Sequence, residues 1–125
     1  MTVIRHLNRL GQSIWLDFIR RSLIDSGELE ALIARGVTGV TSNPTILEKA
    51  IAGSADYDEA LQKLVDEGKT NDEIYLALAL DDIRRAADLF RPVWDATEGA
   101  DGYVSLEANP KLAHDTEGTI AEAQT

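Results

Sequence analysis

The chain has 125 residues, of which 22 are acidic and 12 are basic, so its formal net charge is −10. That length suits one ordinary domain. The absence of cysteine excludes disulfides and cysteine metal sites. The acidity argues against binding to nucleic-acid phosphates, and no apolar run approaches the roughly 20 residues of a membrane helix. Because the first residues also lack the apolar core of a signal peptide, we expect a cytoplasmic globular domain.

The first predicted elements alternate between helices and a short strand. Apolar spacing predicts a short helix over residues 2–10, and a β-branched and aromatic run predicts a strand over 13–19. A helical segment is expected over 20–24. Ser26 is the expected cap of the next helix, and Gly36 is its expected end.

The middle of the chain repeats this alternation. A second strand is expected over residues 36–41. Asn43 is predicted to cap the following helix, and Pro44 to occupy its first position, where its missing N–H costs nothing. A further helix is expected to end near Gly68.

The longest helical pattern begins after Asn71, and Pro92 predicts a stop or a kink in it. Its buried stripe is expected to consist of Ile74, Leu78, Ile83, Ala87 and Phe90. A third strand follows over 102–107, and Asp115 or Thr116 is the expected cap of a last helix. This order of strands and helices is typical of an α/β fold built from parallel βα units.

Each predicted strand carries a polar side chain near its carboxyl end, on the face opposite its apolar residues. These side chains are Asp17, Asn43 and Glu107. Ligands of parallel α/β folds bind at this end of the strands, where two carboxylates and an amide suit proton transfer and hydroxyl binding. Each residue also has a structural interpretation: a turn-bonded carboxylate for Asp17, a helix cap for Asn43 and a loop contact for Glu107.

Other polar residues point to no site of their own. His6 and His114 lack metal-ligand spacing, so no metal site is expected. The pairs Arg20–Arg21 and Arg84–Arg85 are interpreted as solvated helix faces, although the first follows a strand and could approach a phosphate. Residues 36–39 lack the spacing of a glycine-rich phosphate loop.

Four stretches of the sequence together resemble transaldolase. They are residues 11–17 (GQSIWLD), 36–46 (GVTGVTSNPTI), 104–110 (VSLEANP) and 115–119 (DTEGT). The chain is most similar to the longer bacterial forms, some of which are fused to glucose-6-phosphate isomerase. The resemblance implies a class I aldolase-type (β/α)8 TIM barrel. Residues 1–125 would then form the N-terminal part of a single barrel domain, with about the first three βα units and no second domain.

The same resemblance implies an activity. A dihydroxyacetone unit would pass between ketose and aldose phosphates of the fructose 6-phosphate and sedoheptulose 7-phosphate class, in the pentose phosphate pathway, with no cofactor or metal. Asp17 would exchange protons with a substrate hydroxyl, and Glu107 would act through a water on the Schiff base. Asn43 would hold a substrate hydroxyl, with Thr41 beside it.

The nucleophile that this chemistry needs is not evident in the sequence. The family forms its Schiff base with a lysine on the fourth barrel strand, beyond the three strands predicted here. The lysines present are Lys49, Lys63, Lys69 and Lys111, and only Lys111 lies near the expected site. A whole barrel usually takes about 250 residues. We therefore expect the chain to be inactive alone, and to self-associate through the two open edges of a three-stranded sheet.

Two alternatives are kept beside transaldolase. The chain would be either a non-catalytic barrel fragment that binds itself or a partner, or an enzyme similar to fructose-6-phosphate aldolase. The N-terminal helix and the long segment from Asn71 to Pro92 favour transaldolase over the shorter aldolase.

Overall fold

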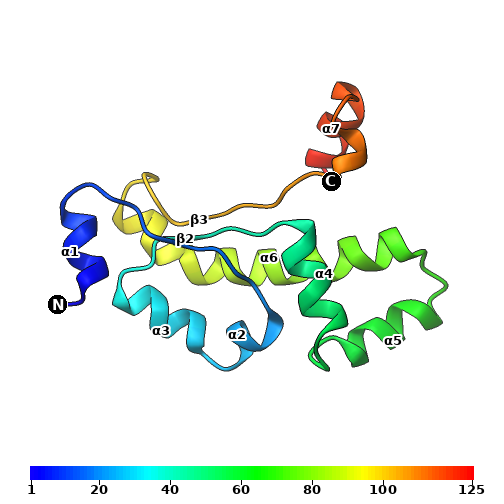
Figure 1. Cartoon of the computed structure of the whole chain (residues 1–125), viewed down its shortest axis with the longest axis horizontal. Coiled ribbons are helices and arrows are strands. Elements are labelled where there is room, and N and C mark those ends of the chain that lie inside the picture. The colour runs from blue at the N-terminus through cyan, green and yellow to red at the C-terminus, as the bar shows by residue number, and fades with distance from the viewer.

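The computed structural model describes residues 1–125 as helices around a small parallel sheet (Figure 1). The strands are β1 (Trp15–Leu16), β2 (Gly39–Val40) and β3 (Tyr103–Val104), and they lie in the order β1-β2-β3. Each pair is parallel, and the first residues of the three strands are aligned, as are the second. The predicted α/β class is therefore confirmed, although each strand is much shorter than its apolar alternation indicated.

The first half of the chain supplies four helices. They are α1 (Val3–Arg9), α2 (Arg21–Asp25), α3 (Glu28–Arg35) and α4 (Pro44–Ala52). The predicted cap of α4 is confirmed, because Asn43 Oδ1 accepts a hydrogen bond from the Ile46 amide at 2.9 Å. Gly36 ends α3 with a φ of 115°, a backbone conformation that favours glycine.

The predicted cap of α3 is wrong by one residue. Gly27 occupies the N-cap position with a φ of 80°, and Ser26 still has the helical conformation that closes α2. The Ser26 hydroxyl accepts from the Glu28 amide at 3.3 Å. The turn between the two helices needs a left-handed residue, and glycine adopts that conformation without steric cost.

The second half contains the longest helix and a more exposed end. Its elements are α5 (Asp58–Asp66), α6 (Asn71–Ala96), η1 (Pro110–Leu112) and α7 (Thr116–Ala123). Thr70 and Glu73 form a capping box at the start of α6. Asp115 caps α7 by accepting from the Gly118 amide at 2.9 Å, as predicted.

Of the stop or kink predicted at Pro92, the stop is wrong, because α6 continues through it to Ala96, and the kink stays a prediction. Proline removes the hydrogen bond to the carbonyl of Asp88, four residues earlier. Both Asp88 and Pro92 are exposed, so water can bond to that carbonyl.

The main core lies between one face of the sheet and the helices α2, α3 and α6. Leu16, Val40 and Val104 reach it from the strands. Its buried residues are Ile19, Leu23, Leu29, Val37, Val40, Leu47, Ala79, Ala86 and Phe90. Figure 1 shows these three helices on one side of the strands, while α7 stands apart on the other side. No helix in the structure has the length and apolarity needed to cross a bilayer.

The buried stripe of α6 differs in part from the prediction. It consists of Ile74, Leu78, Ala79, Asp82, Ala86 and Phe90. Ile83 is only half-buried and Ala87 is exposed. The stripe therefore contains a carboxylate, at a position where the apolar pattern alone predicted none.

The other face of the sheet carries Trp15, Gly39 and Tyr103. The Trp15 indole lies across Gly39 so closely that a Cβ at position 39 would come within 2.3 Å of Trp15 Cε2. Only glycine fits beneath this ring. Asp17 follows Trp15 by two residues, so the alternation of strand side chains continues this face toward Asp17.

Candidate functional site

The carboxyl ends of β1 and β2 are joined through a hydrogen bond between two side chains. Thr41 Oγ1 donates to Asp17 Oδ1 at 2.6 Å. The backbone ladder also extends this far, because the Thr41 amide donates to the Leu16 carbonyl at 2.9 Å and the Ser105 amide to the Val40 carbonyl at 3.0 Å. Asp17 is exposed, and the hydrogen bond to Thr41 engages only one of its two oxygens. The second oxygen is therefore available to a ligand.

Asn43 and Glu107 each follow the paired residues of their strands by three positions. The Asn43 side-chain oxygen caps α4, so the helix-cap interpretation is confirmed, and its side-chain NH₂ makes no hydrogen bond. Glu107 is exposed and forms neither a hydrogen bond nor an ion pair, so the loop contact of its structural interpretation is not seen. Its charge still acts on a neighbour: burial raises the pKa of Tyr75, and the negative charge of Glu107 raises it further.

These residues lie at or just beyond the carboxyl ends of the three aligned strands. The structure brings Asp17 and Thr41 into contact, whereas Asn43 and Glu107 are bonded to neither. The group contains two carboxylates, an amide and a hydroxyl, which can bind sugar hydroxyls and move protons. Lys111 lies in η1 and its side chain is exposed. No three histidine or carboxylate side chains are grouped so as to hold a metal ion.

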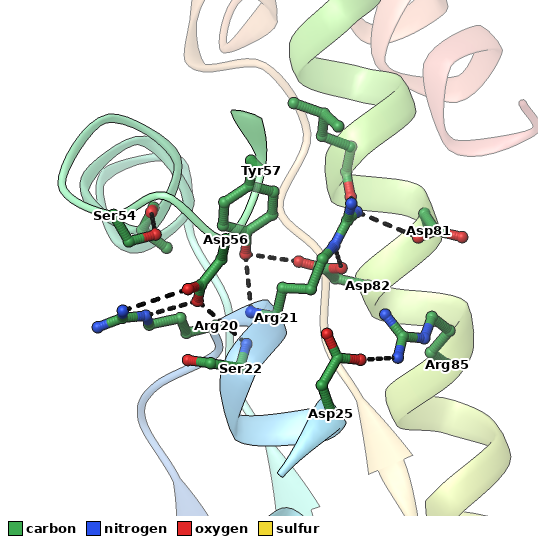
Figure 2. Close-up of polar contacts among 12 residues, drawn as sticks. Arg20, Arg21, Ser22, Asp25, Ser54, Asp56, Tyr57, Asp81, Asp82 and Arg85 are labelled. Carbon is green, nitrogen blue, oxygen red and sulfur yellow. Dashed lines mark hydrogen bonds and ion pairs between the residues drawn. The ribbon is translucent and has the colours of Figure 1, made fainter. Parts of the chain in front are cut away.

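The segment after Asp17 is held by a polar cluster that the sequence analysis missed (Figure 2). Arg20 Nε donates to Asp56 Oδ2 at 2.8 Å, and the Ser22 amide donates to the same oxygen at 3.1 Å. These hydrogen bonds lower the pKa of Asp56 to about 2. Arg21 Nε donates to Asp82 Oδ1 at 2.8 Å. The interpretation of Arg21 as a solvated residue is therefore wrong, since only 11% of its side chain is exposed.

Tyr57 bonds to both Arg21 and Asp82 of this cluster. Its hydroxyl accepts from the Arg21 amide at 2.9 Å and donates to Asp82 Oδ2 at 2.6 Å. Burial and the hydrogen bond to Asp82 raise the pKa of Tyr57. On the exposed side of the cluster, Arg85 forms an ion pair with Asp25, so the interpretation of Arg85 as only a solvated residue is also wrong.

One signal in the sequence pointed to this cluster. Asp82 lies four residues after Leu78 and four before Ala86, so it falls on the buried stripe of α6. A carboxylate at such a position needs a bonded partner, because burying it alone costs several kcal/mol. Its partners Arg21 and Tyr57 are 61 and 25 residues away in sequence, and no local pattern identifies them.

Comparisons with known proteins agree with the motifs. A family model described as "Transaldolase/Fructose-6-phosphate aldolase" matches residues 14–125. A transaldolase of Trichodesmium erythraeum is 50% identical over 118 residues, which cover 94% of this chain and 31% of the relative. A transaldolase of Acidothermus cellulolyticus is 52% identical over 122 residues, or 97% and 33% of the two chains. A transaldolase of Saccharopolyspora erythraea is 52% identical over 118 residues, or 94% and 32%. The chain thus spans about a third of the length of these relatives.

Proposed function

The chain belongs to the transaldolase/fructose-6-phosphate aldolase family, and from that membership we propose that it carries part of a transaldolase active site. The reaction is the transfer of a dihydroxyacetone unit between ketose and aldose phosphates of the fructose 6-phosphate and sedoheptulose 7-phosphate class. Its place is the pentose phosphate pathway in the cytoplasm. The net charge of −10 supports a role without a nucleic-acid partner.

The hydrogen bond from Thr41 to Asp17 is the observation that carries the assignment of the site. It orients one carboxylate oxygen and leaves the other for the proton of a substrate hydroxyl. In the proposed reaction Asp17 takes this proton as the carbon–carbon bond breaks, and the bonding electrons pass to the Schiff base. The side-chain NH₂ of Asn43 donates a hydrogen bond to a second substrate hydroxyl. Thr41 Oγ1, which donates to Asp17, can also accept a hydrogen bond from the substrate.

Glu107 has the other proton-transfer role in the proposal. Its carboxylate is exposed and unpaired, so a water molecule can bond to it. Through that water it assists the formation and the hydrolysis of the Schiff base. Two carboxylates in different surroundings, one bonded to a hydroxyl and one solvated, suit two different proton transfers.

We assign the Schiff-base nucleophile to none of the four lysines in the chain. Each of the four side chains is exposed; they are Lys49, Lys63, Lys69 and Lys111. A nucleophilic lysine needs a desolvated or electropositive setting that releases its proton near neutral pH. Residues 1–125 therefore act as the N-terminal portion of a single barrel, and the isolated chain does not catalyse the complete reaction. No cofactor or metal has a role in this proposal.

A chimeric enzyme tests the proposed site directly. Residues 1–125 would replace the matching third of the Acidothermus cellulolyticus transaldolase, which is 52% identical in this region. We expect an active enzyme in which Asp17→Asn or Glu107→Gln lowers kcat by about 10²- to 10⁴-fold, the usual contribution of a proton-transfer group. Asp88→Asn and Glu117→Gln are matched controls on exposed helix positions. If the site variants keep the activity of the controls, the assigned roles are wrong.

Trapping on the chain itself tests the assignment of the lysine. Borohydride reduction in the presence of fructose 6-phosphate should leave the 125-residue chain unlabelled. The Lys111→Arg variant and the chimera would be treated in parallel, and only the chimera should gain the mass of the reduced dihydroxyacetone unit, which stays on the lysine after the carbon–carbon bond breaks. A stable adduct on Lys111 of the isolated chain would refute the assignment.

The name of the matched family supports a second activity, that of a fructose-6-phosphate aldolase. The two activities differ in the acceptor: the aldolase releases free dihydroxyacetone, whereas the transaldolase passes it to an aldose phosphate. The rate of product formation by the chimera with and without erythrose 4-phosphate separates them. Strict dependence on the acceptor is expected.

Self-association is a third proposal, based on the edges of the sheet. Both β1 and β3 are edge strands, and Tyr103 in β3 and Leu106 just after it are 47% and 37% exposed. Open edges with apolar side chains pair readily with another chain. Analytical ultracentrifugation of the 125-residue chain should show dimers or larger species, and a monomer at all concentrations would contradict this proposal.

A further inference from the structure

Helix α2 begins without a cap of its own. Arg20 is the N-cap residue, and its side chain makes no capping hydrogen bond. The first amides of a helix have no partner inside the helix, so they need one from elsewhere. Here the Arg21 amide donates to Tyr57 Oη at 2.9 Å, and the Ser22 amide donates to Asp56 Oδ2 at 3.1 Å. The cap is thus supplied by the turn between α4 and α5, more than thirty residues away.

The capping groups are themselves fixed from α6. The Tyr57 hydroxyl donates to Asp82 Oδ2 at 2.6 Å, and Arg21 Nε donates to Asp82 Oδ1 at 2.8 Å. These contacts close a ring that runs from the Arg21 amide through Tyr57 and Asp82 to the Arg21 guanidinium (Figure 2). The guanidinium carbon lies 4.7 Å from the centre of the Tyr57 ring. Tyr57 and Asp82 are fully buried, so the ring admits few alternative arrangements.

This ring lies at one end of a very short connection. Only four residues, 17–20, separate β1 from α2. At the strand end, Thr41 bonds to the Leu16 carbonyl and to the Asp17 side chain. In the middle, Ile19 is fully buried in the core. Since the connection is this short, a shift of α2 of about an ångström would pass directly to Asp17.

We infer that Asp56, Tyr57 and Asp82 are positioning residues for Asp17, acting through the start of α2. They do not touch the substrate. Their effect is to hold the connection after β1 so that the Asp17 carboxylate meets Thr41 and the reacting hydroxyl. The catalytic meaning of this inference rests on the proposed function, whereas the geometric coupling to Asp17 does not.

The first experiment measures the coupling on the 125-residue chain by NMR. The Asp17 carboxyl carbon signal is recorded in Tyr57→Phe, which removes only the hydroxyl, and in Asp56→Asn, which keeps an oxygen for the Ser22 amide. Thr41→Val serves as the reference for a released Asp17. Asp81→Asn is the matched control, because Asp81 contacts the same guanidinium at 3.1 Å from the exposed side.

The expected result is a graded displacement of the Asp17 signal. Tyr57→Phe moves it in the direction seen in Thr41→Val and raises the exchange rate of the Arg21 amide about tenfold or more. Asp56→Asn has a smaller effect of the same sign, and Asp81→Asn leaves the signal in place. The inference is overturned if Tyr57→Phe and Asp56→Asn lower the unfolding midpoint while the Asp17 signal stays where it is. Asp56→Asn decides the question if Tyr57→Phe does not fold.

The second experiment reads the same coupling in catalysis. In the chimera, Tyr57→Phe should lower kcat by about tenfold or more with KM within twofold, because an ångström of misplacement can cost up to about a hundredfold in rate. Asp81→Asn should leave both constants unchanged. An inactive parent chimera would count against the proposed function, and the NMR result would still decide the positioning. Unchanged kcat in an active chimera, despite a displaced Asp17 signal, would overturn the catalytic half of the inference.

Discussion

The connections after β1 and after β3 each carry a candidate catalytic carboxylate, but they are held in different ways. After β1, the buried ring of Arg21, Tyr57 and Asp82 and the Asp56 cap connect the segment to α5 and α6. After β3, Ser105 bonds to Val40 and Ser42 of the neighbouring segment. Beyond Glu107, the anchor is Glu122 of α7, whose two carboxylate oxygens accept from the Asn109 amide at 3.2 and 3.3 Å. Asp17 is therefore followed by long-range contacts, whereas Glu107 is followed by a contact between residues only 13 positions apart.

The residues around the first connection are also more deeply buried than those around the second. Ile19 and Leu23, beside the first, are buried in the main core. Helix α7, beside the second, has no buried residue, packs mainly against η1, and leaves Ile120 52% exposed. Local stability in proteins follows such packing, so the two halves of the candidate site are expected to open with different free energies.

The largest expected effect comes from removing the buried carboxylate of the first connection. Asp82→Ala should lower the free energy of unfolding by about 3–5 kcal/mol, because it leaves Arg21 Nε and the buried Tyr57 hydroxyl without their acceptor. Urea unfolding monitored by circular dichroism measures this change. A loss below about 1 kcal/mol would mean that the ring does not hold the connection.

Asp81→Ala is the matched control for this variant. Asp81 pairs with the same Arg21 at 3.1 Å, but 58% of its side chain is exposed. Exposed ion pairs contribute about 1 kcal/mol or less. Comparable losses from the two variants would show that burial is not what distinguishes them.

Acid should loosen the first connection through Asp56, with a smaller effect than Asp82→Ala because the ring remains. The pKa of Asp56 is lowered to about 2 in the folded chain, whereas an unfolded aspartate titrates near about 3.9. The stabilisation is therefore fully present above about pH 4 and is lost as the pH falls toward 2. Hydrogen exchange should show the protection of the Ser22 amide declining over this range. In Asp56→Asn that decline should be absent, and its persistence would assign it to another carboxylate.

The smallest effect is expected at the second connection. Glu122→Ala should cost about 0.5–1.5 kcal/mol locally, the usual net contribution of a hydrogen bond. The protection of the Asn109 amide should fall while the urea midpoint of the whole chain stays nearly constant. Glu122→Gln, which keeps an acceptor oxygen, should behave more like the parent. A large shift of the urea midpoint would contradict the local character of this anchor.

Features with local causes could be predicted from the sequence. The caps at Asn43 and Asp115 and the end of α3 at Gly36 each depend on a few neighbouring residues, and all three are confirmed. Strand alternation likewise placed Asp17 and Thr41 on one face, and these two side chains are hydrogen-bonded.

Features with distant or solvent-dependent causes could not be predicted in this way. The apolar runs extended beyond the two paired residues of each strand and beyond the flanking hydrogen bonds of the ladder. Pro92 is tolerated at an exposed position of α6, where water can replace the lost hydrogen bond, and periodicity does not reveal this. The ring around Asp82 joins residues from three separate parts of the chain, so only the structure identifies its members.

The contact between Trp15 and Gly39 constrains the order in which these two positions can be substituted during evolution. A side chain at position 39 collides with the indole, whereas a smaller residue at position 15 removes bulk and one long hydrogen bond, from the indole to Asp101 at 3.5 Å. Replacement must therefore begin at Trp15, and the opposite order passes through a disfavoured intermediate. In a library that randomises both codons, variants with any side chain at 39 should be recovered almost exclusively together with a small residue at 15.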